Sequence, residues 1–184
     1  MKNLISLQKT FILETLILNK NKRYTYSDYL TWIDDKRREL IDGFVKLVTP
    51  APSRIHQKVS MNLLYLFHHF FKGKKCEVYP APFDARLPKD GEKDDEEINN
   101  VVQPDISVIC DLEKLDDRGC LGAPDLIVEI LSKASGERDL KEKYNLYEQS
   151  GVKEYWIADP VYKSIQVFVL NSGSKYELQQ IHVK

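Results

Sequence analysis

The chain has 184 residues, of which 42% are hydrophobic and 30% are charged, and its formal net charge is -1. These values are typical of an ordinary globular protein that is long enough to bury about two thirds of its unfolded surface. The near-neutral charge excludes a protein that holds nucleic acid by overall positive charge, although a local basic cleft remains compatible with it.

The first twenty residues predict a helical extension. Residues 4–18 carry apolar side chains on more than one face, which favours packing on another surface such as a partner chain. Lys2, Lys9 and Glu14 interrupt the apolar run, so the segment fits neither a membrane span nor a signal peptide. We therefore expect an N-terminal extension over residues 1–20 that serves as an oligomer contact, followed by a single domain over residues 21–184.

The next segment predicts short elements joined by clear turn signals. Residues 25–32 predict a short helix opened by a capping Thr or Ser, and Asp42-Gly43 predicts a hairpin over residues 38–48. A helix over about 54–71 is expected next, and then strands over 76–79 and 83–87. Residues 89–100 are acidic and almost without apolar side chains, which predicts a mobile loop.

The second half of the chain alternates strands with one helix. The expected elements are strands at 104–109 and 124–131 around a turn-rich stretch at 111–122, a helix at 136–150 ended by Gly151, a strand at 154–158, and a hairpin of 164–170 with 175–181. Strands alternate with helices in the middle and pair as hairpins at both ends. The pattern predicts an α/β domain with a mixed β-sheet.

The three cysteines, Cys76, Cys110 and Cys120, predict reduced thiols rather than a bonded framework. Their number is odd, they lack Cys-x-x-Cys spacing, and no His cluster accompanies them, which also argues against a zinc site. Reduced thiols are typical of a cytoplasmic protein, and we expect that compartment.

The two Pro-Asp strands carry acids where hydrocarbon side chains would pack better. Glu129 is the clearest example, because Leu126, Ile127 and Val128 precede it and Ile130 and Leu131 follow it. Burying a lone carboxylate costs several kcal/mol unless a cation or hydrogen bonds compensate it. Such an acid holds a metal, works in acid-base chemistry, or pairs with a buried Lys or Arg.

Period-two alternation predicts how the acids of these strands meet. Asp105 shares a face with Ser107 and Ile109, and Glu129 shares one with Asp125 and Ile127. If the two strands are neighbours in the sheet, Asp105 and Glu129 present oxygens to a single hard cation. Magnesium suits this pair, because it takes one or two carboxylates and completes its octahedron with water and substrate phosphate.

Lys143 is the candidate amine of the site. Placing residues at 100° steps from Leu140 puts Lys143 inside an apolar arc with Leu146 and Tyr147, whereas Lys141 lies on the polar side. Near a metal, this amine could orient a water molecule and stabilise charge on a phosphate. Two purely structural roles stay open: Lys143 could pair with Asp139 within the helix, and Glu129 could pair with an interior cation without any chemistry.

Several ordered motifs resemble a known family. They are ELIDG at 39–43, PSRIHQ at 52–57, VQPDI at 102–106, APDLIVEILS at 123–132, RDLKEK at 138–143 and GVKEYWIADP at 151–160. Together they resemble the Uma2 family of restriction-endonuclease-like proteins, a branch of the PD-(D/E)XK nuclease superfamily. The resemblance runs from about residue 25 to residue 170.

The resemblance implies a restriction-endonuclease-like fold, with a central mixed β-sheet flanked by helices, and magnesium-dependent hydrolysis of DNA phosphodiester bonds, with Mn²⁺ as a substitute metal. Asp105 matches the strand aspartate of the superfamily, and Glu129 matches the acid of its E-x-K element. Leu131 stands where the superfamily has lysine. In the resembling family that lysine moves to the following helix, where Lys143 matches it.

Five further residues are accessory candidates. Glu39 matches an acidic position near the start of the family pattern. Gln103 precedes the first Pro-Asp strand, and Lys141 belongs to a set of basic residues near the site. His56 could position substrate, although local packing at the helix start is the simpler role. Asp84 could extend the acidic site or pair with Arg86 on the same face, and the sequence favours neither.

Two function classes follow from these residues. The first is a magnesium-dependent DNA endonuclease with Asp105 and Glu129 as metal ligands and Lys143 as the third catalytic residue, working as a homodimer away from membranes. The second is a catalytically inactive nuclease-fold module for binding or assembly, which the near-neutral charge and the acidic 89–100 segment favour, since phosphate backbones are bound through Lys and Arg.

Overall fold

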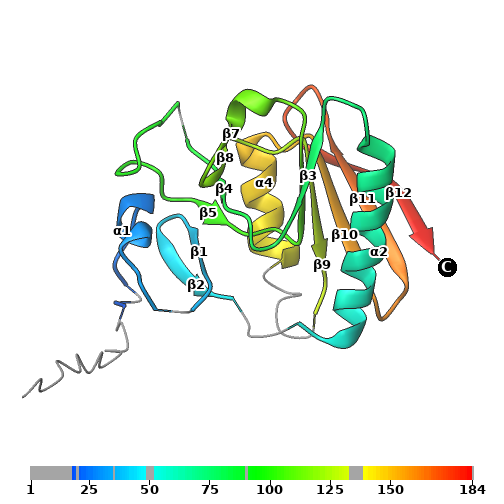
Figure 1. Ribbon diagram of the computed structural model, residues 1–184, viewed down its shortest axis with the longest axis horizontal. Coiled ribbons are helices and arrows are strands. Elements are labelled where there is room, and N and C mark those ends of the chain that lie inside the picture. The colour runs from blue at the N-terminus through cyan, green and yellow to red at the C-terminus, as the bar shows by residue number, and fades with distance from the viewer. Residues whose placement is uncertain are drawn as a thin grey trace, which may run out of the picture.

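The computed structural model describes residues 18–19, 21–34, 36–48, 52–89, 91–132 and 139–183, except for the side chain of Asp139. The helix expected over residues 4–18 therefore lies outside the described residues apart from Leu18. The described chain folds into two mixed β-sheets with helices packed around them (Figure 1).

The sheet that holds both Pro-Asp strands is six-stranded, in the order β12-β11-β10-β9-β6-β3. Its neighbours are antiparallel except for β9 and β10, which run parallel. The strands are β3 (Glu77–Pro80), β6 (Ile106–Ile109), β9 (Leu126–Ile130), β10 (Glu154–Asp159), β11 (Ser164–Leu170) and β12 (Tyr176–Val183). The expected mixed sheet, the strands expected at 104–109 (β6) and 124–131 (β9), and the C-terminal hairpin are confirmed.

Helices cover both faces of this sheet (Figure 1). On one face, α2 (Arg54–Phe71) packs Leu63 and Phe67 against the apolar side of β9. On the other face lie η2, a π-helical segment at Asp139–Lys143, and α4 (Tyr144–Ser150). Parallel strands need a crossover connection, and the helix between β9 and β10 supplies it. In the described part of the chain, no helix is long and apolar enough to cross a membrane.

The second sheet has the order β2-β1-β5-β4-β8-β7. Its strands are β1 (Arg38–Ile41), β2 (Phe44–Leu47), β4 (Ala85–Arg86), β5 (Val101–Val102), β7 (Leu115–Asp116) and β8 (Gly119–Leu121). The short helix α1 (Tyr26–Leu30) and the 3₁₀ turn η1 (Leu112–Lys114) accompany it. The β1–β2 hairpin turns at Asp42 and Gly43, both with positive φ, as the Asp-Gly pair predicts.

The 89–100 segment is more fixed than its acidic composition predicts. Its described residues form no helix or strand, but Ile98 and Asn100 are fully buried. The Tyr26 amide donates to the Ile98 carbonyl, and the Asp42 amide donates to Asn100 Oδ1. The prediction of a mobile loop is therefore wrong for the second half of the segment, because two buried side chains are enough to attach it to α1 and the hairpin.

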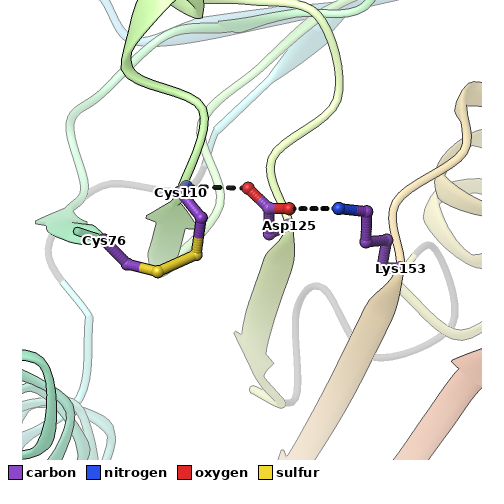
Figure 2. The surroundings of a disulfide bond; sticks show 4 residues. All are labelled: Cys76, Cys110, Asp125 and Lys153. Carbon is purple, nitrogen blue, oxygen red and sulfur yellow. Dashed lines mark hydrogen bonds and ion pairs between the residues drawn. A yellow bond between two sulfur atoms is a disulfide. The ribbon is translucent and has the colours of Figure 1, made fainter. Parts of the chain in front are cut away.

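The cysteines also differ from the prediction. Cys76 and Cys110 form a disulfide that joins the ends of β3 and β6, while Cys120 is free and buried. Figure 2 shows Asp125 beside this bridge, with its carboxylate accepting from the Cys110 amide at 2.7 Å and from Lys153 Nζ at 2.6 Å. Reduced thiols at Cys76 and Cys110 were the wrong expectation, because antiparallel pairing of β3 with β6 brings together residues 34 positions apart. The cytoplasmic compartment was expected because the thiols were thought to be reduced, so the disulfide removes the reason for that expectation.

Candidate active site

The candidate site lies where β6 and β9 run side by side. The two strands are antiparallel, with Ile106 paired to Val128 and Ser107 paired to Ile127. Continuing this register by one residue places Asp105 opposite Glu129. Directly opposite residues of an antiparallel pair lie on the same side of the sheet, but the contacts of the two acids differ: Asp105 contacts His56 of α2, whereas Glu129 contacts Tyr147 on the face that α4 covers.

Lys143 reaches this face from the end of the π-helical segment. Its Nζ lies 2.7 Å from Glu129 Oε1 and 2.9 Å from Glu39 Oε1. All three side chains are buried, with Glu39 at 1%, Glu129 at 3% and Lys143 at 2% exposure. A buried carboxylate is costly alone, and the shared ammonium offsets that cost for both acids.

Tyr147 completes the cluster one turn after Lys143. Its hydroxyl donates to Glu129 Oε1 at 2.7 Å. Burial raises the pKa of Tyr147 well above its ordinary value, and the nearby carboxylates of Glu129 and Glu39 raise it further. The phenol therefore stays protonated and remains a hydrogen-bond donor to Glu129.

The helical arc predicted for Lys143 holds only in part. Lys143, Leu146 and Tyr147 are buried together, as expected, but Leu140 is 47% exposed. The reason is that Asp139–Lys143 is π-helical, so residues before Lys143 do not follow the 100° steps of an α-helix. Lys141 is exposed. The alternative pairing of Lys143 with Asp139 involves a side chain outside the described residues.

Asp105 is held by two donors through one of its oxygens. Oδ2 accepts from the Ile130 amide at 2.8 Å and lies 3.1 Å from His56 Nε2. His56 is in the first turn of α2, where the Ser53 hydroxyl accepts from its backbone amide. The Asp105 side chain is 22% exposed, and Oδ1 makes no hydrogen bond to any residue that the structure describes. His56 thus contacts an acid of the site rather than packing only locally.

Gln103 links the cluster to Asp84. Its backbone amide donates to Glu39 Oε1 at 2.9 Å, and its side-chain Nε2 donates to Asp84 Oδ1 at 2.8 Å. Burial raises the pKa of Asp84, although hydrogen bonds from Gln103 and Tyr29 oppose the rise. Arg86 pairs with Asp116 at 2.7 Å and not with Asp84, so the second of the two roles considered for Asp84, an ion pair with Arg86, is not formed.

Carboxylate oxygens are the ligands that a hard divalent cation prefers. Asp105 and Glu129 are the candidate carboxylates, and Oδ1 of Asp105 accepts no hydrogen bond from any residue that the structure describes. Among the described residues, no group of three or more His, Cys, Asp or Glu side chains is arranged to hold a metal. Two protein carboxylates completed by water and phosphate oxygens are the arrangement magnesium accepts.

Two residues of the site were not identified from the sequence. Tyr147 stands in the predicted apolar arc, and its spacing of four residues from Lys143 was the available signal for a shared contact. Arg37, whose Nε donates to Gln103 Oε1 at 2.9 Å, is an exposed residue two positions before Glu39 and gave no signal.

Comparisons with known proteins agree with the motifs. The sequence model of the Uma2 family, described as "Putative restriction endonuclease", matches residues 26–184. The chain is similar to the "Uncharacterized protein slr1290" of Synechocystis sp. (strain ATCC 27184 / PCC 6803 / Kazusa), at 24% identity over 157 residues, which cover 84% of this chain and 72% of that protein. It also resembles the crystal structure of "a putative nuclease belonging to DUF820" from Anabaena variabilis ATCC 29413, with a TM-score of 0.63, 18% identity, and coverage of 87% and 84% of the two chains.

Proposed function

The chain belongs to the Uma2 family, and from that premise we propose that it is a magnesium-dependent endonuclease that hydrolyses phosphodiester bonds of DNA. The observation that carries the proposal is the 2.7 Å contact of Lys143 Nζ with Glu129, on a strand paired in register with the strand of Asp105. The description of the Anabaena structural relative as a nuclease supports the coarser part of this proposal, which is nuclease activity.

Asp105 and Glu129 would hold the metal, and each is suited to this role in a different way. The Ile130 amide and His56 both contact Oδ2 of Asp105, which fixes the carboxylate, and Oδ1 would be the oxygen that binds the metal. Glu129 is fixed by Lys143 and Tyr147. When bound, the metal polarises the scissile phosphate and lowers the pKa of a coordinated water.

Lys143 is the residue that acts on the reacting groups. Its ammonium lies against both Glu129 and Glu39, which fix its position beside Glu129, one of the two proposed metal ligands. From there it can donate to the attacking water or to a phosphate oxygen, and its positive charge stabilises the negative charge that develops on the phosphate. Attack of the water on phosphorus breaks the bond to the 3′ oxygen, which takes up the proton and leaves a 5′-phosphate and a 3′-hydroxyl.

A second candidate function rests on the same contacts. Glu129 Oε1 already accepts from both Lys143 and Tyr147, and such a saturated buried cluster also serves a purely structural purpose. This observation favours a nuclease-fold module that binds nucleic acid or assembles with a partner without turnover.

Cleavage of supercoiled plasmid separates the two functions. The protein is incubated with plasmid in Mg²⁺ or Mn²⁺, beside Asp105→Asn, Glu129→Gln and Lys143→Met. Loss of a single group that stabilises the transition state typically lowers the rate by about 100-fold or more, so we expect each variant to lose at least that much activity and EDTA to abolish it.

Matched controls are Asp117→Asn and Lys75→Ala, which change an exposed acid and an exposed lysine. Both should cleave like the wild type, and circular dichroism checks that every variant is folded. Cleavage that survives equally in all three site variants would refute the assignment. A folded wild type that binds DNA without cutting it in either metal would favour the non-catalytic module.

A further inference from the structure

Arg37, which directly precedes β1, and Arg38, its first residue, lie in different surroundings. Arg38 is 3% exposed, and its Nη2 lies 2.6 Å from Asp34 Oδ2. Arg37 is exposed to solvent, yet it is fixed at two points. Its carbonyl accepts from the Val48 amide at 3.1 Å, and its Nε donates to Gln103 Oε1 at 2.9 Å, across 66 positions of sequence.

Gln103 can hold Arg37 in only one orientation. Its Nε2 donates to Asp84 Oδ1 at 2.8 Å and to the Tyr29 hydroxyl at 3.2 Å. Rotating the amide by half a turn would aim its oxygen at the Asp84 carboxylate and its nitrogen at the Arg37 guanidinium. Both contacts would then be repulsive, so the network around Asp84 determines that Oε1 faces Arg37.

This anchoring leaves the outer edge of the guanidinium available. Among the described residues, the hydrogen bond of the Arg37 guanidinium is made by Nε, and the terminal Nη1 and Nη2 groups lie on an exposed side chain. Two parallel N–H donors match the geometry of two phosphate oxygens. Ordering an exposed arginine costs side-chain entropy, and an exposed polar contact gives little free energy in return. A hydrogen bond at Nε that orders the side chain in advance is therefore typical of a residue that binds a ligand.

The same glutamine places Arg37 beside the site. The Gln103 backbone amide bonds to Glu39, and Glu39 bonds to Lys143. We propose that Arg37 binds a backbone phosphate of the nucleic acid strand next to the cleaved bond, and that the side chain of Gln103 is its positioning residue. This inference rests on the proposed nuclease function and adds a substrate contact to it.

Binding of a fluorescent DNA duplex without metal tests this assignment apart from cleavage. The Arg37→Ala variant should bind about tenfold more weakly, and the slope of log affinity against log salt should fall by about one phosphate contact. Arg37→Lys should recover only part of the loss, because lysine keeps the charge but has no Nε to be anchored. Lys75→Ala, an exposed lysine at the far end of β6 from Asp105, should behave like the wild type.

Gln103→Met tests the positioning role, because it removes the side-chain amide and keeps the backbone amide that bonds to Glu39. We expect weaker DNA binding when Arg37 is present and no further loss when Gln103→Met is added to Arg37→Ala. An unchanged salt slope in Arg37→Ala, a wild type that does not bind the duplex, or an equal loss from Gln103→Met in both backgrounds would overturn the inference.

The outcomes also separate this inference from the nuclease proposal. A wild type that binds DNA through Arg37 but never cleaves it would refute the nuclease activity and leave the phosphate contact standing. If cleavage depends on Lys143 but Arg37→Ala binds DNA as tightly as the wild type, only the phosphate contact is refuted.

Discussion

Single residues of the site are held by short chains of hydrogen bonds. Lys143, Tyr147 and Gln103 each donate to a carboxylate that is almost fully buried, Glu129 or Glu39. Removing one donor from such a group leaves part of its charge unsatisfied, and the cost is larger than the net value of an ordinary hydrogen bond. The free energy of unfolding of variants that lack one donor therefore tests the hydrogen bonds to Glu129 and Glu39.

Tyr147→Phe tests the phenol at the centre of the cluster. We expect a loss of about 1–3 kcal/mol in the free energy of unfolding at pH 8, because Glu129 loses one of its donors. The raised pKa of Tyr147 means that the stabilisation is complete below the unfolded value near 10 and is lost as the pH rises above it.

Urea unfolding at pH 8 and pH 11 provides the measurement for this variant. The difference between wild type and Tyr147→Phe should shrink at pH 11, while the other tyrosines cancel in the comparison. A difference that stays constant or grows with pH would show that Tyr147 is not held protonated by its surroundings.

Some residues of the candidate site could be identified from the sequence alone, and others could not. Glu129 could be identified because a lone acid interrupts an apolar run, and Lys143 because it falls in an apolar arc. Arg37 could not, since an exposed arginine before a strand is ordinary and its partner Gln103 is 66 positions away. The catalytic roles of Asp105, Glu129 and Lys143 stay predictions until cleavage is measured.

Side-chain contacts, in addition to backbone hydrogen bonds, join strands β3, β6, β9 and β10. The disulfide of Cys76 and Cys110 joins β3 to β6, and Asp125, which precedes β9, bonds both Cys110 and Lys153 (Figure 2). These contacts tie the end of the sheet opposite to the acid pair. Their removal should change stability much more than it changes the site.

Thiol titration tests the disulfide directly. The unfolded, unreduced protein should show one reactive thiol, Cys120, and three after reduction. Closing a loop between residues 34 apart typically stabilises a fold by about 2–4 kcal/mol, so reductant should lower the melting temperature. Three reactive thiols before reduction would restore the expectation drawn from the sequence.

Asp125→Asn tests the junction of these strands through pH. Burial raises the pKa of Asp125, but hydrogen bonds from Lys153 and the Cys110 amide outweigh this and lower it below its ordinary value of 3.8. A lowered folded-state pKa gives stability that is present above the unfolded pKa and is lost as the pH falls through the folded pKa.

The variant should therefore lose about 1–2 kcal/mol at pH 7, where the charged hydrogen bonds are complete. The gap between the two proteins should close in unfolding experiments below pH 3.8. An equal gap at pH 7 and in strong acid would mean that the Asp125 charge contributes nothing to the fold.

Elements with a strong local signal were predictable, including the short helix α1 that Thr25 caps, whereas strands β5 and β7 were not. The hairpin at Asp42-Gly43 and helix α2 have the signals that their geometry requires. Strands β5 and β7 contain only two residues each, too few for a visible alternation. The π-helical segment before α4 also has no sequence signature that distinguishes it from an α-helix.

The site as a whole depends on both sheets. Glu39 comes from β1 of one sheet and Glu129 from β9 of the other, and Lys143 bonds both across sequence separations of 104 and 14 residues. The family resemblance predicted the fold class, which the structural relative confirms at a TM-score of 0.63. Contacts between sheets depend on long-range pairing, which a pattern of period two or 3.6 does not encode. The homodimer and the N-terminal extension over residues 1–20 stay predictions.

The most direct test of the central claim is the single-turnover cleavage rate of a labelled DNA duplex in saturating Mg²⁺, compared between wild type and Lys143→Met. We expect cleavage by the wild type and a rate at least about 100-fold lower for the variant, with a folded far-ultraviolet spectrum in both. Equal rates for the two proteins, or a wild-type rate that survives removal of the metal, would contradict it.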